Sequence, residues 1–156
     1  MNYSQGLINL WDKFEGNELE AYPDPKTGGD PWTVGRGHTG PEVHEGTTIT
    51  EEQSRIYFED DMEWVVNTVN KNVVVPLTQN QFDALCSIIG NVGPGSRYKD
   101  GIIQLKNGQP STLLKKLNTF DYQGAAAEFL KWDSPGSAVQ HGLDNRRKAE
   151  HDLFLS

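Results

Sequence analysis

Two carboxylates and a hydroxyl near the N-terminus are the side chains of this sequence best suited to chemistry. Glu15 is followed nine positions later by Asp24, and Thr33 lies in the segment Trp32-Thr33-Val34-Gly35. Cleavage of a glycosidic bond uses such a pair, because one carboxyl must be protonated to assist the leaving oxygen while the other is ionised to activate water or stabilise a cationic sugar. Spacing alone is a weak indication, since most such pairs are solvated surface charges.

The elements that must position these side chains follow from the spacing of apolar residues. A helix is predicted to end at Glu15, because Leu7, Trp11 and Phe14 fall on one helical face and Gly16 supplies a stop. Residues 19–22 and 32–34 are typical of short strands, with Pro and Gly residues marking the turn between them. Glu15 is therefore expected at a helix-to-loop junction, with Asp24 facing it from a turn.

The rest of the chain is predicted to be helical. Thr50 begins a capping-box pattern, and the apolar spacing after it predicts a long helix that ends at about Asn72. A second box begins at Thr78, and the apolar stripe after it contains Cys86, which we expect to be a buried thiol rather than a nucleophile. Further helices are predicted at about residues 111–117, 122–132 and 138–154. The fold class is α+β and mostly helical.

Composition limits the possible functions. A chain of 156 residues fits one compact domain or two small lobes that share a core. Residues 1–70 hold fourteen acidic and four basic residues, a net charge of −10, whereas residues 71–156 have a net charge of +2. Such acidity disfavours nucleic acid as a partner, because phosphate binding relies on clustered Lys and Arg. Membrane insertion is not expected, since no apolar run reaches about 18 residues.

The start of the sequence has no basic region followed by an apolar one, so we expect no signal peptide. The protein is therefore expected to accumulate in the cytoplasm of the cell that produces it.

Motifs along nearly the whole chain carry a resemblance to a known family. They are Phe14-Glu15-Gly16, Ala21-Tyr22-Pro23-Asp24-Pro25, Trp32-Thr33-Val34-Gly35, Gly37-His38-Thr39-Gly40, Gln81-Phe82-Asp83-Ala84-Leu85, Asn91-Val92-Gly93, Ser111-Thr112-Leu113-Leu114, Ala125-Ala126-Ala127-Glu128-Phe129 and Arg146-Arg147. In that order the chain resembles the phage-type lysozymes, the endolysins of glycoside hydrolase family 24.

The resemblance implies a fold and a reaction. It implies one lysozyme-like domain over residues 1–156, in which a small β-hairpin lobe at about 15–50 is joined by a long helix to a helical lobe at about 51–156 that includes the N-terminal helix. The reaction is hydrolysis of the β-1,4 bond between N-acetylmuramic acid and N-acetylglucosamine in peptidoglycan. The glycan strands are then the partner, a phage holin provides release to the wall, and the protein is a monomer with no metal and no cofactor.

Carried over by position, the family also implies roles for single residues. Glu15 would be the general acid, Asp24 the second carboxylate, and Thr33 the hydroxyl that positions the attacking water. The remaining implied roles are substrate contact and structural pairing: Thr39 and Asn91 would contact substrate, and His38 would pair with Asp61.

Three features depart from the family pattern. The turn at residues 26–30 is three residues longer than in the shortest family form, which makes Asp30 a rival for a role in the site. Residues 97–109 are interpreted as an inserted loop or hairpin. The chain is acidic, whereas relatives are often basic.

Two alternative functions remain open at this point. One is a catalytically silent lysozyme-like module that binds wall glycans, which the intact Glu15 disfavours. The other is a lytic transglycosylase, which forms an anhydro sugar without water; the presence of Asp24 and Thr33 favours hydrolysis.

Several other patterns have a structural interpretation as their first expectation. The sequence Gly35-Arg36-Gly37-His38-Thr39-Gly40 matches G-x-G-x-x-G, but no βαβ unit surrounds it, so sharp backbone turns are favoured over dinucleotide binding. No second histidine stands at ligand spacing from His38, which disfavours a metal site. Trp132 is expected in the core. For Arg146-Arg147-Lys148, contact with anionic wall polymer and a solvated helix face are equally compatible with the sequence.

Overall fold

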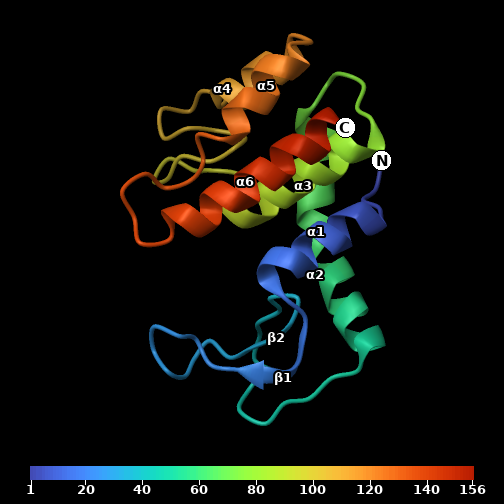
Figure 1. The fold of residues 1–156 in the computed structure, drawn as a ribbon, viewed down its shortest axis with the longest axis vertical. Coiled ribbons are helices and arrows are strands. Elements are labelled where there is room, and N and C mark those ends of the chain that lie inside the picture. The colour runs from blue at the N-terminus through green and yellow to red at the C-terminus, as the bar shows by residue number, and fades with distance from the viewer. The chain divides into compact units, whose positions relative to one another are not determined.

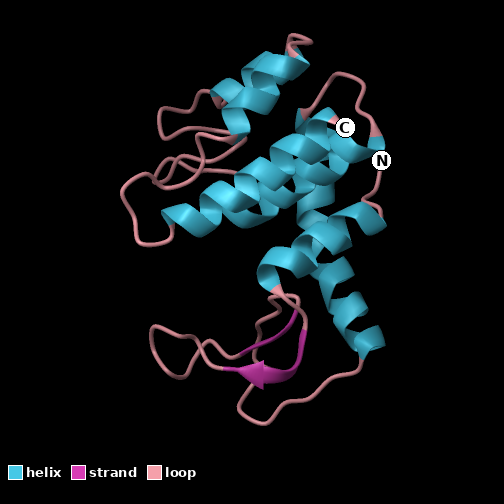
Figure 2. Cartoon of the chain, in the orientation of Figure 1, coloured by secondary structure: helices cyan, strands magenta, loops and turns pink.

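A computed structural model describes residues 1–156 and contains six helices and one two-stranded sheet (Figure 1). The elements in chain order are α1 Gln5–Glu15, β1 Glu18–Tyr22, β2 Thr33–Gly35, α2 Glu51–Asn72, α3 Gln79–Val92, α4 Thr112–Asn118, α5 Tyr122–Phe129 and α6 Gln140–Leu155. The mostly helical α+β fold predicted from the sequence is confirmed (Figure 2). None of the helices is both long enough and apolar enough to cross a membrane.

The chain divides into two compact units. One unit comprises residues 11–63, and the other comprises residues 1–10 and 64–156. Both divisions fall inside helices, so α1 and α2 each contribute residues to both units. The prediction of a single lysozyme-like domain over residues 1–156 stays a prediction.

The unit of residues 11–63 is built around the antiparallel pair of β1 and β2. Tyr22 is paired in register with Thr33, and Glu18 is paired with Gly35. Gly35 has φ +62° and Gly37 has φ +89°, so the backbone after β2 turns through a region that favours glycine. Apolar packing comes from the last turns of α1 and from α2, where Trp11 and Phe58 meet edge to face, with ring centroids 5.6 Å apart.

The helical unit has its core between α3 and α6, which lie side by side in Figure 1, while α4 packs against α5. The predicted capping box opens α3: the Thr78 hydroxyl accepts from the Gln81 amide, and the Gln81 side chain accepts from the Thr78 amide. Cys86 is buried within α3, and burial, with a smaller contribution from Asp83, raises the pKa of its thiol to about 12. The thiol is therefore protonated and unreactive, as expected.

The inserted segment at residues 97–109 forms a loop and contains no strand. Gly95 and Gly101 lie against each other and against the Gln104 carbonyl so closely that a Cβ on either glycine would clash with backbone atoms. Ile102 is buried, and its carbonyl accepts a hydrogen bond from the Ser111 hydroxyl at 2.5 Å. The insertion is therefore packed onto its own unit at Ile102, although its tip around Tyr98 is exposed.

Candidate active site

Glu15 occupies the last position of α1. The helix stops there because Gly16 adopts φ +74°, and the Gly16 amide donates to the Asp12 carbonyl at 3.0 Å. The half-buried side chain of Glu15 lines a pocket of about 400 Å³ together with Glu18 and Tyr22 of β1. The structure thus brings the predicted acid to the start of the hairpin.

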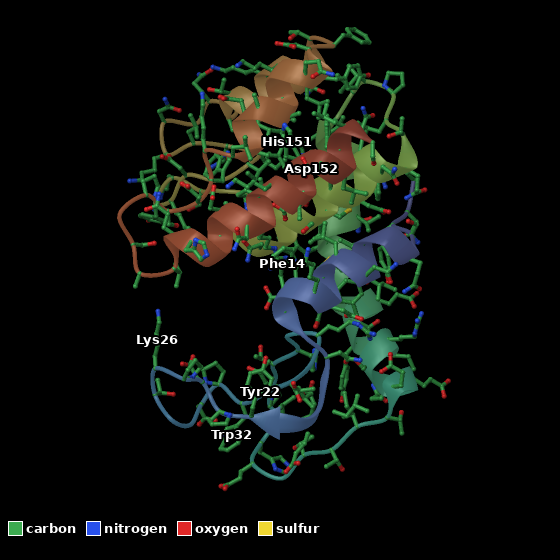
Figure 3. All side chains as sticks on the ribbon, viewed as in Figure 1. Phe14, Tyr22, Lys26, Trp32, His151 and Asp152 are labelled. Carbon is green, nitrogen blue, oxygen red and sulfur yellow. The ribbon has the colours of Figure 1, made fainter.

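Tyr22 is a member of this pocket to which sequence reasoning gave no role. Burial, followed by the charges of Glu15 and Glu18, raises the pKa of its phenol above the ordinary value. The phenol therefore stays protonated at neutral pH and is available as a hydrogen-bond donor. Figure 3 labels it on the hairpin. Its position at the end of a strand, two residues before Asp24, is the signal that could have identified it.

Asp24 is held by the turn that follows β1. Its carboxylate Oδ1 accepts from the Lys26 amide at 2.7 Å, its own amide donates to the Gly29 carbonyl at 2.9 Å, and its carbonyl accepts from the Gly28 amide at 2.8 Å. This Asx-type turn fixes the direction of the carboxylate through local hydrogen bonds. Lys26 and Thr27 lie within the loop closed by these bonds, and both are exposed; Figure 3 labels Lys26.

Thr33 and Asp30 are placed differently. Thr33 is half-buried and directly opposite Tyr22 in the hairpin, so side chains of an antiparallel pair at these two positions lie on the same face. Asp30 is exposed at the end of the closed turn, where its backbone carbonyl accepts from the Thr27 hydroxyl at 2.7 Å. Thr33 therefore shares a face of the hairpin with Tyr22, and its hydroxyl donates to the Pro31 carbonyl at 3.4 Å.

His38 lies between two carboxylates in the same unit. Its Nδ1 is 2.9 Å from Asp61 Oδ2, its Nε2 is 2.5 Å from Glu42 Oε1, and its ring stacks on Tyr57 with centroids 3.8 Å apart. Burial lowers the pKa of His38, but the hydrogen bonds and charges of Glu42 and Asp61 outweigh it, and the net pKa is raised. This arrangement suits an imidazolium with a structural role.

The two residues predicted to contact substrate lie in different units. Thr39 is exposed in the unit of residues 11–63, whereas Asn91 belongs to the helical unit. Asn91 accepts a hydrogen bond from the buried Arg147 and lines a pocket of about 340 Å³ with Trp132 and the insertion residue Lys99. Trp132 is half-buried in the wall of this pocket, so its expected place in the core is wrong.

The basic run at residues 146–148 is corrected by the structure. Arg146 and Arg147 are 3% and 0% exposed, and each forms an ion pair with the fully buried Glu150. They are neither a surface for anionic polymer nor a solvated helix face, because α6 presents them to the interior of its unit. Only Lys148 of the three is exposed, where it pairs with Asp144.

A carboxylate at the end of a helix, next to a hairpin that carries a second carboxylate and a hydroxyl, is an arrangement that suits a lysozyme-type glycoside hydrolase, which uses a pair of carboxyls. Comparison with known proteins agrees with this class. The sequence model of the family described as phage lysozyme matches residues 12–150. The chain therefore belongs to the phage lysozyme family.

Individual relatives support this assignment. The chain is 43% identical over 159 residues to an endolysin of Bacillus phage B103, all of the chain aligning with 55% of that protein. It is similar to the crystal structure of a P22 lysozyme mutant, with 36% identity, a TM-score of 0.80 and coverage of 100% of this chain and 99% of that one. The structure of the muramidase domain of SpmX from Asticaccaulis excentricus is 31% identical to this chain, with a TM-score of 0.76. The match covers 99% of this chain and 98% of that one.

Proposed function

We propose that this phage lysozyme is a muramidase that hydrolyses the β-1,4 bond between N-acetylmuramic acid and N-acetylglucosamine in peptidoglycan. The observation that carries the proposal is the pocket of about 400 Å³ in which Glu15, at the end of α1, meets Tyr22 of the hairpin. Tyr22 is paired with Thr33 and lies two residues before Asp24, so one short hairpin supplies both remaining groups.

In this mechanism Glu15 protonates the glycosidic oxygen as the bond breaks. Asp24 stabilises the cationic sugar or accepts a proton from the attacking water, and the Thr33 hydroxyl orients that water. The neutral phenol of Tyr22 donates a hydrogen bond to a sugar oxygen within the pocket. Each group acts at a position fixed by backbone structure, which is the condition for effective positioning.

The proposal includes the setting of the reaction. The protein is made in the cytoplasm of the host cell, acts as a monomer, and reaches the wall when a phage holin opens the membrane. Its relatives named endolysins support an action on the cell wall.

One experiment tests the reaction against its alternatives. Purified peptidoglycan is digested, and the products are identified by mass spectrometry. A hydrolase yields reducing muropeptides that have gained one water, a lytic transglycosylase yields anhydro sugars without added water, and a silent module yields no products. Anhydro products or no products from the parent protein would refute the proposal.

Variants of the two carboxylates assign the roles. Glu15→Gln removes the only general acid of the proposed site and is expected to abolish nearly all wall-lysing activity, while the circular dichroism and melting temperature stay close to those of the parent. Asp24→Asn keeps an oxygen that can accept from the Lys26 amide, so a partial loss is expected. Appreciable turnover by Glu15→Gln would contradict its role as the acid.

A further inference from the structure

Arg36 is a buried arginine that no step of the proposed mechanism uses. Arg36 is 6% exposed, and each of the three nitrogens of its guanidinium has a hydrogen-bond partner. Nε donates to Asp12 Oδ1 at 2.6 Å and Nη2 donates to Asp12 Oδ2 at 3.2 Å, so the contact with that carboxylate is bidentate. Nη2 also donates to Glu51 Oε1 at 2.9 Å, and Nη1 donates to Ser54 Oγ at 3.1 Å.

These contacts hold the last turn of α1 from two sides. Asp12 lies three residues before Glu15, which places both side chains on neighbouring positions of one helical turn. The carbonyl of Arg36 also accepts a hydrogen bond from Trp11 Nε1 at 3.1 Å. The side chain and the backbone of Arg36 therefore both bind the turn that carries Glu15.

The same residue is rigidly connected to the hairpin. Arg36 follows β2 directly, and Thr33 lies three residues before it at the start of that strand. The strand is fixed by its pairing with β1, and the backbone around Val34 is closed by two 2.9 Å hydrogen bonds with His38. A shift of the Arg36 backbone relative to α1 would therefore move Thr33 relative to Glu15.

A third element completes the network at the start of α2. The Ser54 hydroxyl donates to Asn17 Oδ1 at 2.6 Å, and Asn17 Nδ2 donates to Glu51 Oε2 at 2.7 Å. Both partners of Arg36 on α2 are thus linked to the segment that joins Glu15 to β1. An apolar side chain could fill this volume, but only a guanidinium fork fixes the direction of three elements together.

We propose that Arg36 is a positioning residue that sets the placement of the general acid on α1 relative to the hydroxyl on the hairpin. It acts through Asp12 and the Trp11 indole, and it touches no substrate. This inference rests on the proposed roles of Glu15 and Thr33.

The first test replaces the guanidinium by a side chain of similar length. Arg36→Met is expected to lower kcat on soluble peptidoglycan fragments by about 10- to 100-fold, because misplacement of reacting groups by about 1 Å can cost that much. KM should change by less than about threefold, since ground-state binding does not need the same alignment. The matched control is Arg55→Met: Arg55 also faces Glu51, at 3.9 Å, but is 52% exposed, and its loss should leave kcat unchanged.

A second test separates positioning from a merely structural role. Each kcat is measured well below the melting temperature of that variant and is normalised to folded protein, so a loss of stability alone does not lower it. If Arg36 acts through Asp12, the double variant Arg36→Met with Asp12→Asn should lose no more kcat than the worse of the two single variants. Arg36→Lys keeps the charge but not the forked guanidinium, so its kcat should lie between those of the parent and Arg36→Met. It replaces Arg36→Met as the test variant if Arg36→Met does not fold.

Each outcome decides a different question. A kcat equal to that of the parent protein in folded Arg36→Met overturns the inference. If Arg36→Met does not fold, the same result in Arg36→Lys overturns it. Fully additive losses of kcat in the double variant also overturn it. Glu15→Gln is assayed in parallel: if it retains turnover, the proposed site itself fails. If Glu15→Gln is inactive and folded Arg36→Met is fully active, only the positioning role of Arg36 is lost.

Discussion

At the scale of single residues, the longer turn after β1 raises the question of which side chain positions the water. Thr33 is half-buried opposite Tyr22, whereas Asp30 is exposed beyond a turn that closes between Asp24 and Gly29. Asp30 therefore does not line the pocket of Glu15, Glu18 and Tyr22, whereas Thr33 is paired with Tyr22 of that pocket.

Thr33→Ala is expected to lower wall lysis on the order of 10²-fold through lost positioning of the water. Asp30→Ala serves as the matched change in the same segment and should be nearly neutral. The two rates are compared on purified walls at equal concentrations of folded protein. The reverse ranking would mean that the longer turn has transferred the role to Asp30.

At the scale of elements, His38 joins the loop after β2 to α2 through Asp61. Because the folded-state pKa of His38 is raised, its contribution to stability is fully present below the unfolded value of about 6.5 and is lost as pH rises through the folded value. Its second partner is Glu42, and the hydrogen bond with His38 lowers the pKa of this carboxyl. The contribution of Glu42 to stability is therefore lost as pH falls below the unfolded pKa of about 4.3.

We therefore expect the contact to stabilise the protein between about pH 4.5 and 6.5. Asp61→Asn should reduce the free energy of unfolding by roughly 0.5–1 kcal/mol at pH 5.5, a modest value because Asp61 is 42% exposed. At pH 8.5 the difference from the parent should shrink. Urea denaturation at both pH values measures the effect, and a difference that grows with pH would contradict the assigned charge of His38.

The pairing of α3 with α6 depends on a buried charged group. Glu150 accepts from the Ser87 hydroxyl of α3 at 2.5 Å and pairs with the fully buried Arg147 at 3.0 Å, while burial raises the pKa of Glu150 and lowers that of Arg147. Arg147 in turn donates to Asn91 at the end of α3. Both charges have lost solvation, so each depends on the other.

Glu150→Gln is expected to reduce the free energy of unfolding by about 3–5 kcal/mol, because the buried guanidiniums of Arg146 and Arg147 both lose this counter-charge. Asp152→Asn, two residues further on α6, is the control: this carboxylate is 79% exposed and should change stability by less than about 0.5 kcal/mol. Equal stability of the two variants would show that the buried pair contributes nothing to the packing of α6.

At the scale of the whole molecule, the chain has a net charge of −8 while its proposed substrate is an anionic wall. Arg146 and Arg147 are buried, so they are unable to offset this repulsion by binding wall polymer. The remaining exposed cations include Lys99 and Lys131 beside the pocket of the helical unit.

Wall lysis should therefore rise or hold steady between 0.01 M and 0.1 M salt, because the Debye length falls from about 30 Å to about 10 Å and screens the repulsion. A short neutral oligosaccharide should show little salt dependence. A steep fall in wall lysis over this range would indicate that exposed lysines dominate binding, which Lys99→Gln with Lys131→Gln would then test.

The sequence by itself determined most of the elements, because local physical signals specify them. Gly16 ends α1 at Glu15, capping residues begin α2 and α3, and apolar spacing extends α2 to Asn72, as predicted. The hairpin around Asp24 was predicted from its turn residues for the same reason.

Tertiary structure decided the environment of each side chain, because burial and pairing depend on residues far apart in the chain. Arg147 was read as exposed or polymer-binding, yet Glu150 and Asn91 hold it in the interior. Arg36 stands between two glycines and received no role from the sequence, yet its contacts with Asp12 and Glu51 span 24 and 15 positions of sequence. No local pattern encodes such contacts, since they exist only once the folded elements bring the partner charges together.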